Sequence, residues 1–135
     1  VCRIRERYGF PGMIVLQFCF EEGVPDVKKY SPERWLYTGT HDNQTLRGWF
    51  ESLSPNSPSY KHLREYCALH QFTDCQAHLN AENIHLIMRN IALSSSCQQV
   101  IFPYQDILGL GDEARMNIPG TALGNWQWRL ENLNF

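Results

Sequence analysis

A short apolar run at residues 13–20, MIVLQFCF, constrains the fold of this chain most strongly. It is too short for a typical helix and rich in residues that favour strands, so it predicts a strand buried on both faces. Two further apolar segments, residues 35–40 and 99–103, predict a second and a third strand. Strands this apolar, separated by helices, favour a parallel sheet covered on both faces and therefore the α/β class.

Helical patterns separate the second and third predicted strands. The spacing of apolar residues predicts helices over about residues 43–53, 58–70 and 81–93. Ser57, which is followed by proline, fits an N-cap with proline at the first helical position. Near the end of the chain, residues 117–120, NIPG, predict a turn whose proline and glycine suit the two central positions of type II.

A polar triplet, His41-Asp42-Asn43, follows the second apolar segment within TGTHDNQT at residues 38–45. Asp and Asn are leading N-cap residues, so Asp42 or Asn43 is a candidate cap for the following helix. Side chains at the carboxyl ends of parallel strands also face the substrate crevice of α/β proteins, which makes Asp42 a candidate site residue. The triplet alone favours the cap and leaves the site open.

Charge and cysteine content exclude several classes of function. Lysine and arginine number 12 against 14 acidic residues, and the net charge of -2 gives no reason to expect a nucleic acid or an anionic membrane as partner. No apolar stretch approaches the roughly 20 residues that span a bilayer. The 5 cysteines include no C-x-x-C pair, so reduced thiols in a cytoplasmic protein are the simplest account. His70, Cys75 and His78 fit no common zinc pattern, and we expect no metal.

Three long segments of the chain occur in an order and spacing that identify one family. They are RYGFPGMIVLQFCFEEG at 7–23, YTGTHDNQTLRGWF at 37–50 and VIFPYQDILGLGDEARMNIPGTALGNWQWRL at 100–130. Together they resemble the 4-alpha-glucanotransferases of glycoside hydrolase family 77. The resemblance implies a (β/α)8 TIM barrel, which takes about 250 residues. We therefore expect residues 1–135 to be the C-terminal part of that barrel, strands 6 to 8 with their helices, truncated at the N-terminal side and at the C-terminus.

The same resemblance implies a retaining reaction, in which an aspartate nucleophile forms a covalent glycosyl-enzyme and a glutamate acts as acid and then base. By their place in the family, both of these residues lie upstream of this sequence. The third carboxylate of the family maps onto Asp42, which would hold hydroxyls of the sugar at the cleavage site and stabilise the transition state. His41 would donate a hydrogen bond to that sugar. Phe18, Glu22 and Asn117 match positions that line the sugar-binding cleft, although the family often has aspartate where Glu22 stands.

The resemblance thus predicts an enzyme that moves a segment of an α-1,4-glucan to a new acceptor glucan or glucose, without a cofactor. Its partners would be a malto-oligosaccharide or α-glucan and the remainder of the parent barrel, in the cytoplasm or, for a plant protein, in the plastid. The chain alone is expected to be inactive because two of the three carboxylates are absent. The alternatives are a non-catalytic glucan-binding or scaffold fragment and a complete small α/β domain that reuses these motifs.

Several candidate site residues also have a structural interpretation. Phe18 would pack in the core, Glu22 would end a strand in solvent, and Asn117 would begin a turn. Asp106, just past the third predicted strand, is explained at least as well as the cap of a short helix beginning near Ile107, so it stays outside the predicted catalytic set.

Overall fold

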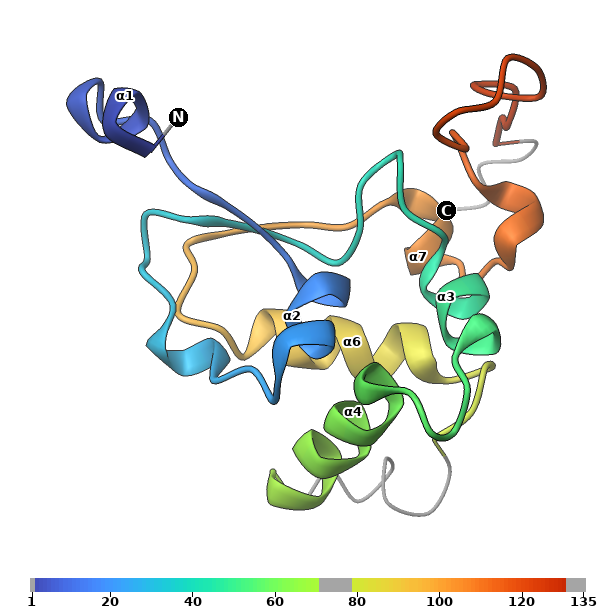
Figure 1. Ribbon diagram of the computed structural model, residues 1–135, viewed down its shortest axis with the longest axis horizontal. Helices are drawn as coiled ribbons and strands as arrows, with labels where there is room; N and C mark the ends of the chain where they lie inside the picture. The colour runs from blue at the N-terminus through green and yellow to red at the C-terminus, as the bar shows by residue number, and fades with distance from the viewer. Residues whose placement is uncertain (1, 71–78, 131–135) are drawn as a thin grey trace.

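Short strands and helices alternate along the chain (Figure 1), of which the computed structural model describes residues 2–70 and 79–130. In chain order the elements are α1 (Cys2–Arg7), β1 (Met13–Val15), α2 (Leu16–Glu22), the 3-10 helix η1 (Val27–Lys29), β2 (Trp35–Tyr37), α3 (Leu46–Ser52), α4 (Pro58–Leu69), α6 (Ile84–Leu93), β3 (Gln99–Ile101), α7 (Tyr104–Ile107) and the 3-10 helix η2 (Asp112–Ala114). None of the helices in these two ranges is long and apolar enough to cross a membrane.

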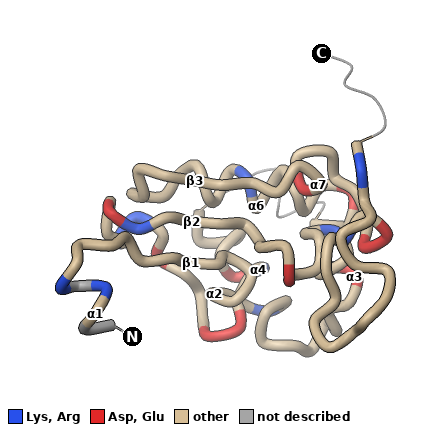
Figure 2. Tube along the Cα trace, turned by 90° about the horizontal axis from the view of Figure 1, so that it is seen from above, with Lys and Arg blue, Asp and Glu red and all other residues tan. Residues whose placement is uncertain are grey.

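The three strands form one parallel sheet in the order β1-β2-β3, which confirms the predicted α/β class. Figure 2 shows the strands side by side and without charged residues. Ile14, Leu36 and Val100 stand opposite one another in the register and belong to the core. Helices α2, α4 and α6 lie on this side of the sheet (Figure 1), so the core is formed between one sheet face and one layer of helices.

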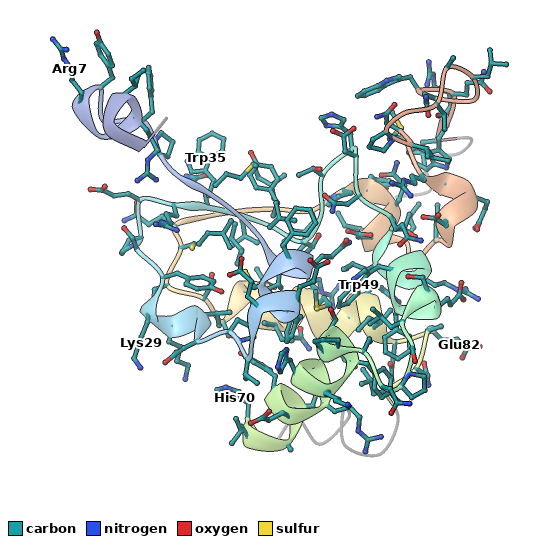
Figure 3. All side chains as sticks on the ribbon, in the orientation of Figure 1. Arg7, Lys29, Trp35, Trp49, His70 and Glu82 are labelled. Carbon is teal, nitrogen blue, oxygen red and sulfur yellow. The ribbon has the colours of Figure 1, made fainter. Side chains whose placement is uncertain are left out.

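The opposite face of the sheet is open in the part of the chain that the structure describes. Met13 is 61% exposed and Trp35 is 40% exposed. Figure 3 shows Trp35 on the side of the sheet away from α2, α4 and α6. The sequence predicted cover on both faces, and among residues 2–70 and 79–130 only one face is covered.

Phe20 lies at the centre of the helix layer. Its side chain is fully buried, with its ring centroid 6.4 Å from that of Trp49 and 6.0 Å from that of Tyr66. The three rings come from α2, α3 and α4, so Phe20 joins three helices through apolar contact. Figure 3 shows the indole of Trp49 directed into this layer.

The run at residues 13–20 does not form one strand, contrary to the prediction. β1 ends at Val15 and α2 begins at the next residue. Leu16, Gln17 and Phe20 are buried together, which is the spacing of a helix face. Pairing with β2 also stops at Val15, so the ladder provides no partner for a longer strand. Periodicity in so short an apolar run does not separate a strand from a helix.

The two longest predicted helices are confirmed as α4 and α6. The Ser57 hydroxyl accepts a hydrogen bond from the Tyr60 N–H at 3.4 Å, and a proline follows Ser57 as predicted. Before α6, the side-chain oxygen of Asn80 accepts hydrogen bonds from the N–H groups of Glu82 and Asn83 at 2.9 and 3.0 Å. Ser57 therefore caps α4, whereas Asn80 closes the turn before α6, whose N-cap residue Asn83 makes no side-chain cap bond.

The cap of α3 is Thr45 and not the polar triplet. Thr45 Oγ1 accepts a hydrogen bond from the Gly48 N–H at 3.1 Å. The prediction that Asp42 or Asn43 caps this helix is wrong, because α3 begins at Leu46 and the N-cap position is the residue just before it. This result removes the structural explanation of Asp42 that the triplet alone favoured.

Replacing this cap tests its contribution to stability. We expect Thr45→Ala to lower the free energy of unfolding by about 1 kcal/mol, because the Gly48 N–H loses its acceptor in a buried position. Urea unfolding of the purified protein measures the change. Thr45→Ser, which keeps the hydroxyl, should lose clearly less, and equal losses for the two variants would contradict the capping role.

Candidate functional site

The polar triplet occupies the loop between β2 and α3, at the carboxyl end of the sheet. Asn43 Oδ1 accepts hydrogen bonds from the Thr40 N–H at 2.9 Å and from the Thr40 hydroxyl at 2.7 Å, and these bonds close the turn. The side chains of His41 and Asp42 are 54% and 51% exposed. Asn43 thus braces the loop, and the two residues before it are accessible to a solute.

A second loop, after η2, meets the triplet. Asn117 Nδ2 donates a hydrogen bond to Asp42 Oδ1 at 2.6 Å, across 75 positions of sequence. His41 Nε2 lies 3.4 Å from the same oxygen. Within the described residues no hydrogen bond reaches Asp42 Oδ2, which leaves this oxygen available to a ligand hydroxyl. Three of the predicted site residues, His41, Asp42 and Asn117, are therefore brought together.

The turn predicted at residues 117–120 lies one residue later. The Thr121 N–H donates to the Ile118 carbonyl at 3.2 Å, and Gly120 has φ 82°. Proline and glycine take the central positions of a type II turn as predicted, but Ile118 and not Asn117 begins it. The Asn117 side chain instead binds Asp42, so its interpretation as a turn residue is wrong.

Trp126 packs on the exposed side of this group. Its ring centroid is 5.0 Å from that of His41, with the planes inclined by 37°. Trp126 has φ 62°, a backbone conformation that costs a non-glycine residue on the order of 1–3 kcal/mol. Its N–H donates to the Met116 carbonyl at 2.6 Å, which helps to hold it there. Because Trp126 is 51% exposed, its aromatic surface extends the accessible site beside His41.

Asp106 anchors both ends of the loop that carries the triplet. Its Oδ2 accepts a hydrogen bond from the Thr38 hydroxyl at 2.9 Å, and its Oδ1 accepts one from the Leu46 N–H at 2.8 Å. The pKa of the Asp106 carboxyl is raised overall, because the effect of burial is larger than the lowering by these two hydrogen bonds. The prediction of a cap for a helix near Ile107 is wrong, because Asp106 lies inside α7 and satisfies the first turn of α3 instead.

Phe18 and Glu22 lie on α2 and not at the end of a strand. Phe18 is 50% exposed, so it lies outside the core that the described residues form. Glu22 lines a hollow of about 360 Å³ together with residues that include Cys19 and Tyr30. None of the residues that line this hollow belongs to either loop of the site, so the structure does not bring Glu22 to Asp42.

Two residues that contact the site loops were missed by the sequence analysis. Gln17 Nε2 donates to the Gln44 carbonyl at 3.0 Å, and Gln17 is the single polar residue of its apolar run, which could have indicated a special role. Arg115 Nη2 donates to the Asp42 carbonyl at 2.7 Å. Its position two residues before Asn117 gave no indication of this partner, which is distant in sequence.

Metal-binding side chains do not gather in the described part of the chain, where no group of three or more His, Cys, Asp or Glu residues could hold an ion. Of the three residues that the sequence analysis weighed as a metal cluster, Cys75 and His78 lie outside the described residues.

Comparison with known sequences points to one family. The family model described as 4-alpha-glucanotransferase, of glycoside hydrolase family 77, matches residues 1–134. The 4-alpha-glucanotransferase of Thermus thermophilus is 36% identical over 134 residues, which cover 94% of this chain and 25% of that protein. The corresponding protein of Synechocystis is 42% identical over 130 residues, with 93% and 24% covered. The chloroplastic/amyloplastic relative of Arabidopsis thaliana is 38% identical over 133 residues, with 96% and 21% covered.

A solved structure shares the fold. It is amylomaltase from Streptococcus agalactiae in complex with acarbose, which matches with a TM-score of 0.75 and 30% sequence identity. The match covers 96% of this chain and 25% of that chain. The chain thus spans about a quarter of the length of the relatives that it matches.

Proposed function

Because the chain belongs to glycoside hydrolase family 77, the 4-alpha-glucanotransferases, we propose that it is the C-terminal part of an enzyme that transfers a segment of an α-1,4-glucan to an acceptor glucan or glucose. One observation carries the proposal: His41, Asp42 and Asn117 meet at the carboxyl end of a parallel sheet. Active sites of (β/α)8 enzymes lie at this end. The matched amylomaltase was solved with acarbose, an oligosaccharide, which supports a glucan as the ligand.

In this proposal Asp42 stabilises the transition state. A retaining transfer passes through an oxocarbenium-like transition state on its way to the covalent glycosyl-enzyme. The carboxylate of Asp42 is held through Oδ1 by Asn117, and its Oδ2 accepts hydrogen bonds from hydroxyls of the sugar. Its negative charge also favours the positive charge that develops on the sugar ring. His41, beside the same carboxylate, donates a hydrogen bond to the same sugar.

The remaining catalytic groups, an aspartate nucleophile and a glutamate acid/base, are supplied in this proposal by sequence outside these 135 residues. The coverage of about a quarter of each relative supports this division. Phe18 and Glu22 are proposed to line the glucan cleft, and the exposure of Phe18 supports its part. The separate hollow around Glu22 lends no support to a contact near Asp42.

The three strands are proposed to be the sixth, seventh and eighth strands of the barrel. A barrel wall carries helices on its outer face and packs side chains against one another on its inner face. The sheet has that asymmetry, since helices cover one face while Met13 and Trp35 are exposed on the other. The remainder of the barrel would cover these two side chains. Cys19 and Cys97 are free thiols, which supports a cytoplasmic location, or a plastid location for a plant protein.

Disproportionation of maltotriose tests the proposed function. We expect the full-length protein that contains this chain to release glucose and form longer maltodextrins. The 135-residue chain alone should release none, because it carries only one of the three carboxylates. If the isolated chain transferred glucan segments, the nucleophile and the acid/base would not have to come from sequence outside these 135 residues. If the full-length protein showed no transfer, the proposed function itself would be wrong.

A titration of the isolated chain with maltoheptaose, followed by tryptophan fluorescence, addresses the glucan-binding alternative. Trp126 is exposed beside His41 and should report a bound sugar. We expect weak binding or none, because the rest of the cleft is missing. Saturable binding would support a glucan-binding module instead.

A further inference from the structure

We propose that Arg115 is a positioning residue that fixes the two loops of the site relative to each other, so that Asp42 and Asn117 present their side chains to the sugar in one geometry. This inference rests on the proposed function, because it concerns how the site of that reaction is held together.

The guanidinium of Arg115 makes two hydrogen bonds and one longer ion-pair contact. Nε donates to the Asn117 carbonyl at 2.8 Å, and Nη2 donates to the Asp42 carbonyl at 2.7 Å. Nη1 lies 3.8 Å from Asp112 Oδ2. One planar side chain therefore links the β2–α3 loop to the loop after η2, at the two residues whose side chains meet in the site.

Both hydrogen bonds of Arg115 are made to main-chain carbonyls, so they fix the backbone of the two loops. The Asn117–Asp42 hydrogen bond lies at an exposed position, where water competes for both partners. It does not by itself hold two loops in register. The hydrogen bonds from Arg115 fix the positions of the two main chains. The side chains of Asp42 and Asn117 then lie within hydrogen-bonding distance of each other.

Arg115 is itself held from the side of α3. Its side chain is 16% exposed, and its ion-pair partner Asp112 also accepts a hydrogen bond from Gln44 Nε2 at 3.4 Å. Asp112 packs directly against Gly48 of α3, where an added Cβ would lie 2.6 Å from the Asp112 Cβ. The guanidinium is therefore anchored to a packed helix on one side and reaches the exposed loops on the other.

The three-way contact requires arginine. A guanidinium presents donors in a fixed planar fork, whereas a lysine ammonium is a single point of charge. Lysine at this position would keep the charge and most of the length but would not donate to both carbonyls in this fixed planar geometry. If Arg115 supplied only a positive charge, lysine would replace it without loss.

The test is Arg115→Lys in the full-length enzyme, assayed by maltotriose disproportionation. We expect kcat to fall by about 10- to 100-fold, because small misplacements of catalytic groups cost this much. KM should change by less than about threefold, since the lost interactions belong to the transition state. Arg47→Lys is the matched control: Arg47 pairs with Glu51 at 3.0 Å on the surface of α3 and contacts neither loop. A wild-type kcat for Arg115→Lys, or an equal loss for Arg47→Lys, overturns the inference.

A second set of variants separates positioning from general stability. Arg115 binds the main-chain carbonyl of Asp42 and Asn117 binds its carboxylate, so both position the same residue. The losses in kcat of Arg115→Lys and Asn117→Ala should therefore combine to less than their sum in free energy. If the kcat losses of the two single variants add fully in the double variant, the inference is overturned. It is also overturned if the unfolded fraction of Arg115→Lys at the assay temperature, measured by a thermal melt, accounts for its loss of kcat. Asp42→Asn measured alongside identifies which claim fails. If the wild-type full-length protein shows no transfer, the proposed function is wrong. If Asp42→Asn keeps its turnover, the proposed role of Asp42 is wrong, and if Asp42→Asn alone loses activity, only the positioning role of Arg115 is wrong.

Discussion

Asp42→Asn in the full-length protein is expected to lower kcat for maltotriose disproportionation by about 10²- to 10³-fold, the usual cost of removing one electrostatic contact to a transition state. The amide keeps the shape of the carboxylate and an oxygen that can accept the bond from Asn117 Nδ2. It removes the negative charge, which is the property that favours an oxocarbenium-like centre. Because the Asp42 side chain is 51% exposed, we expect no measurable change in thermal unfolding.

Asp26→Asn is the matched control for this experiment. The Asp26 side chain is 53% exposed and pairs with Lys29 at 2.8 Å, so it resembles Asp42 in exposure and in having one polar partner. It lies before η1, away from both loops of the site. We expect this variant to keep its kcat. If both variants retained turnover, Asp42 would have no catalytic role, and if both lost it equally, the effect would not be specific to the site.

Phe20→Ala is expected to lower the free energy of unfolding by about 3–5 kcal/mol. The ring is fully buried and contacts Trp49 and Tyr66 from two other helices, so its removal leaves a cavity where α2, α3 and α4 meet. Domains are typically stable by only about 5–15 kcal/mol, and this loss would therefore unfold a substantial part of the population on mild heating. Urea or thermal unfolding of the purified protein measures it.

Phe18→Ala provides the control on the same helix. Phe18 is 50% exposed, and we expect a loss below about 1 kcal/mol. The comparison also tests the local structure, because residues 18 and 20 would share a face in a strand but are separated in a helix. Equal losses for the two phenylalanines would favour the strand that the apolar run predicted over α2.

Local patterns explain which parts of the fold could be predicted. The apolar cores of β1, β2 and β3, the helices α4 and α6 and the Ser57 cap of α4 depend on residues close together in the chain, and all are confirmed. The errors lie at boundaries. The first strand ends at Val15 because its partner strand ends there, and this limit is set by pairing that no local pattern contains.

In the candidate site, too, some features follow from neighbouring residues and others depend on contacts between distant segments. The resemblance predicted His41, Asp42 and Asn117 as residues of one site, and the structure brings their side chains together through the bond between Asp42 and Asn117 and the proximity of His41. Nothing in the sequence indicated that Asp106 would cap a helix 60 positions away, or that Arg115 would bind the Asp42 carbonyl. Each of these bonds needs two segments to be brought together before either partner is within reach.

The amino-acid order was therefore sufficient for the family and for the parallel α/β sheet, because apolar periodicity and long motifs are present in neighbouring residues. Three-dimensional packing alone showed how the site is held. Hydrogen bonds from Asn117 and Arg115 to Asp42, and from Thr38 and Leu46 to Asp106, join positions far apart in the chain. Their strength depends on distances of about 3 Å that arise only when the chain is folded.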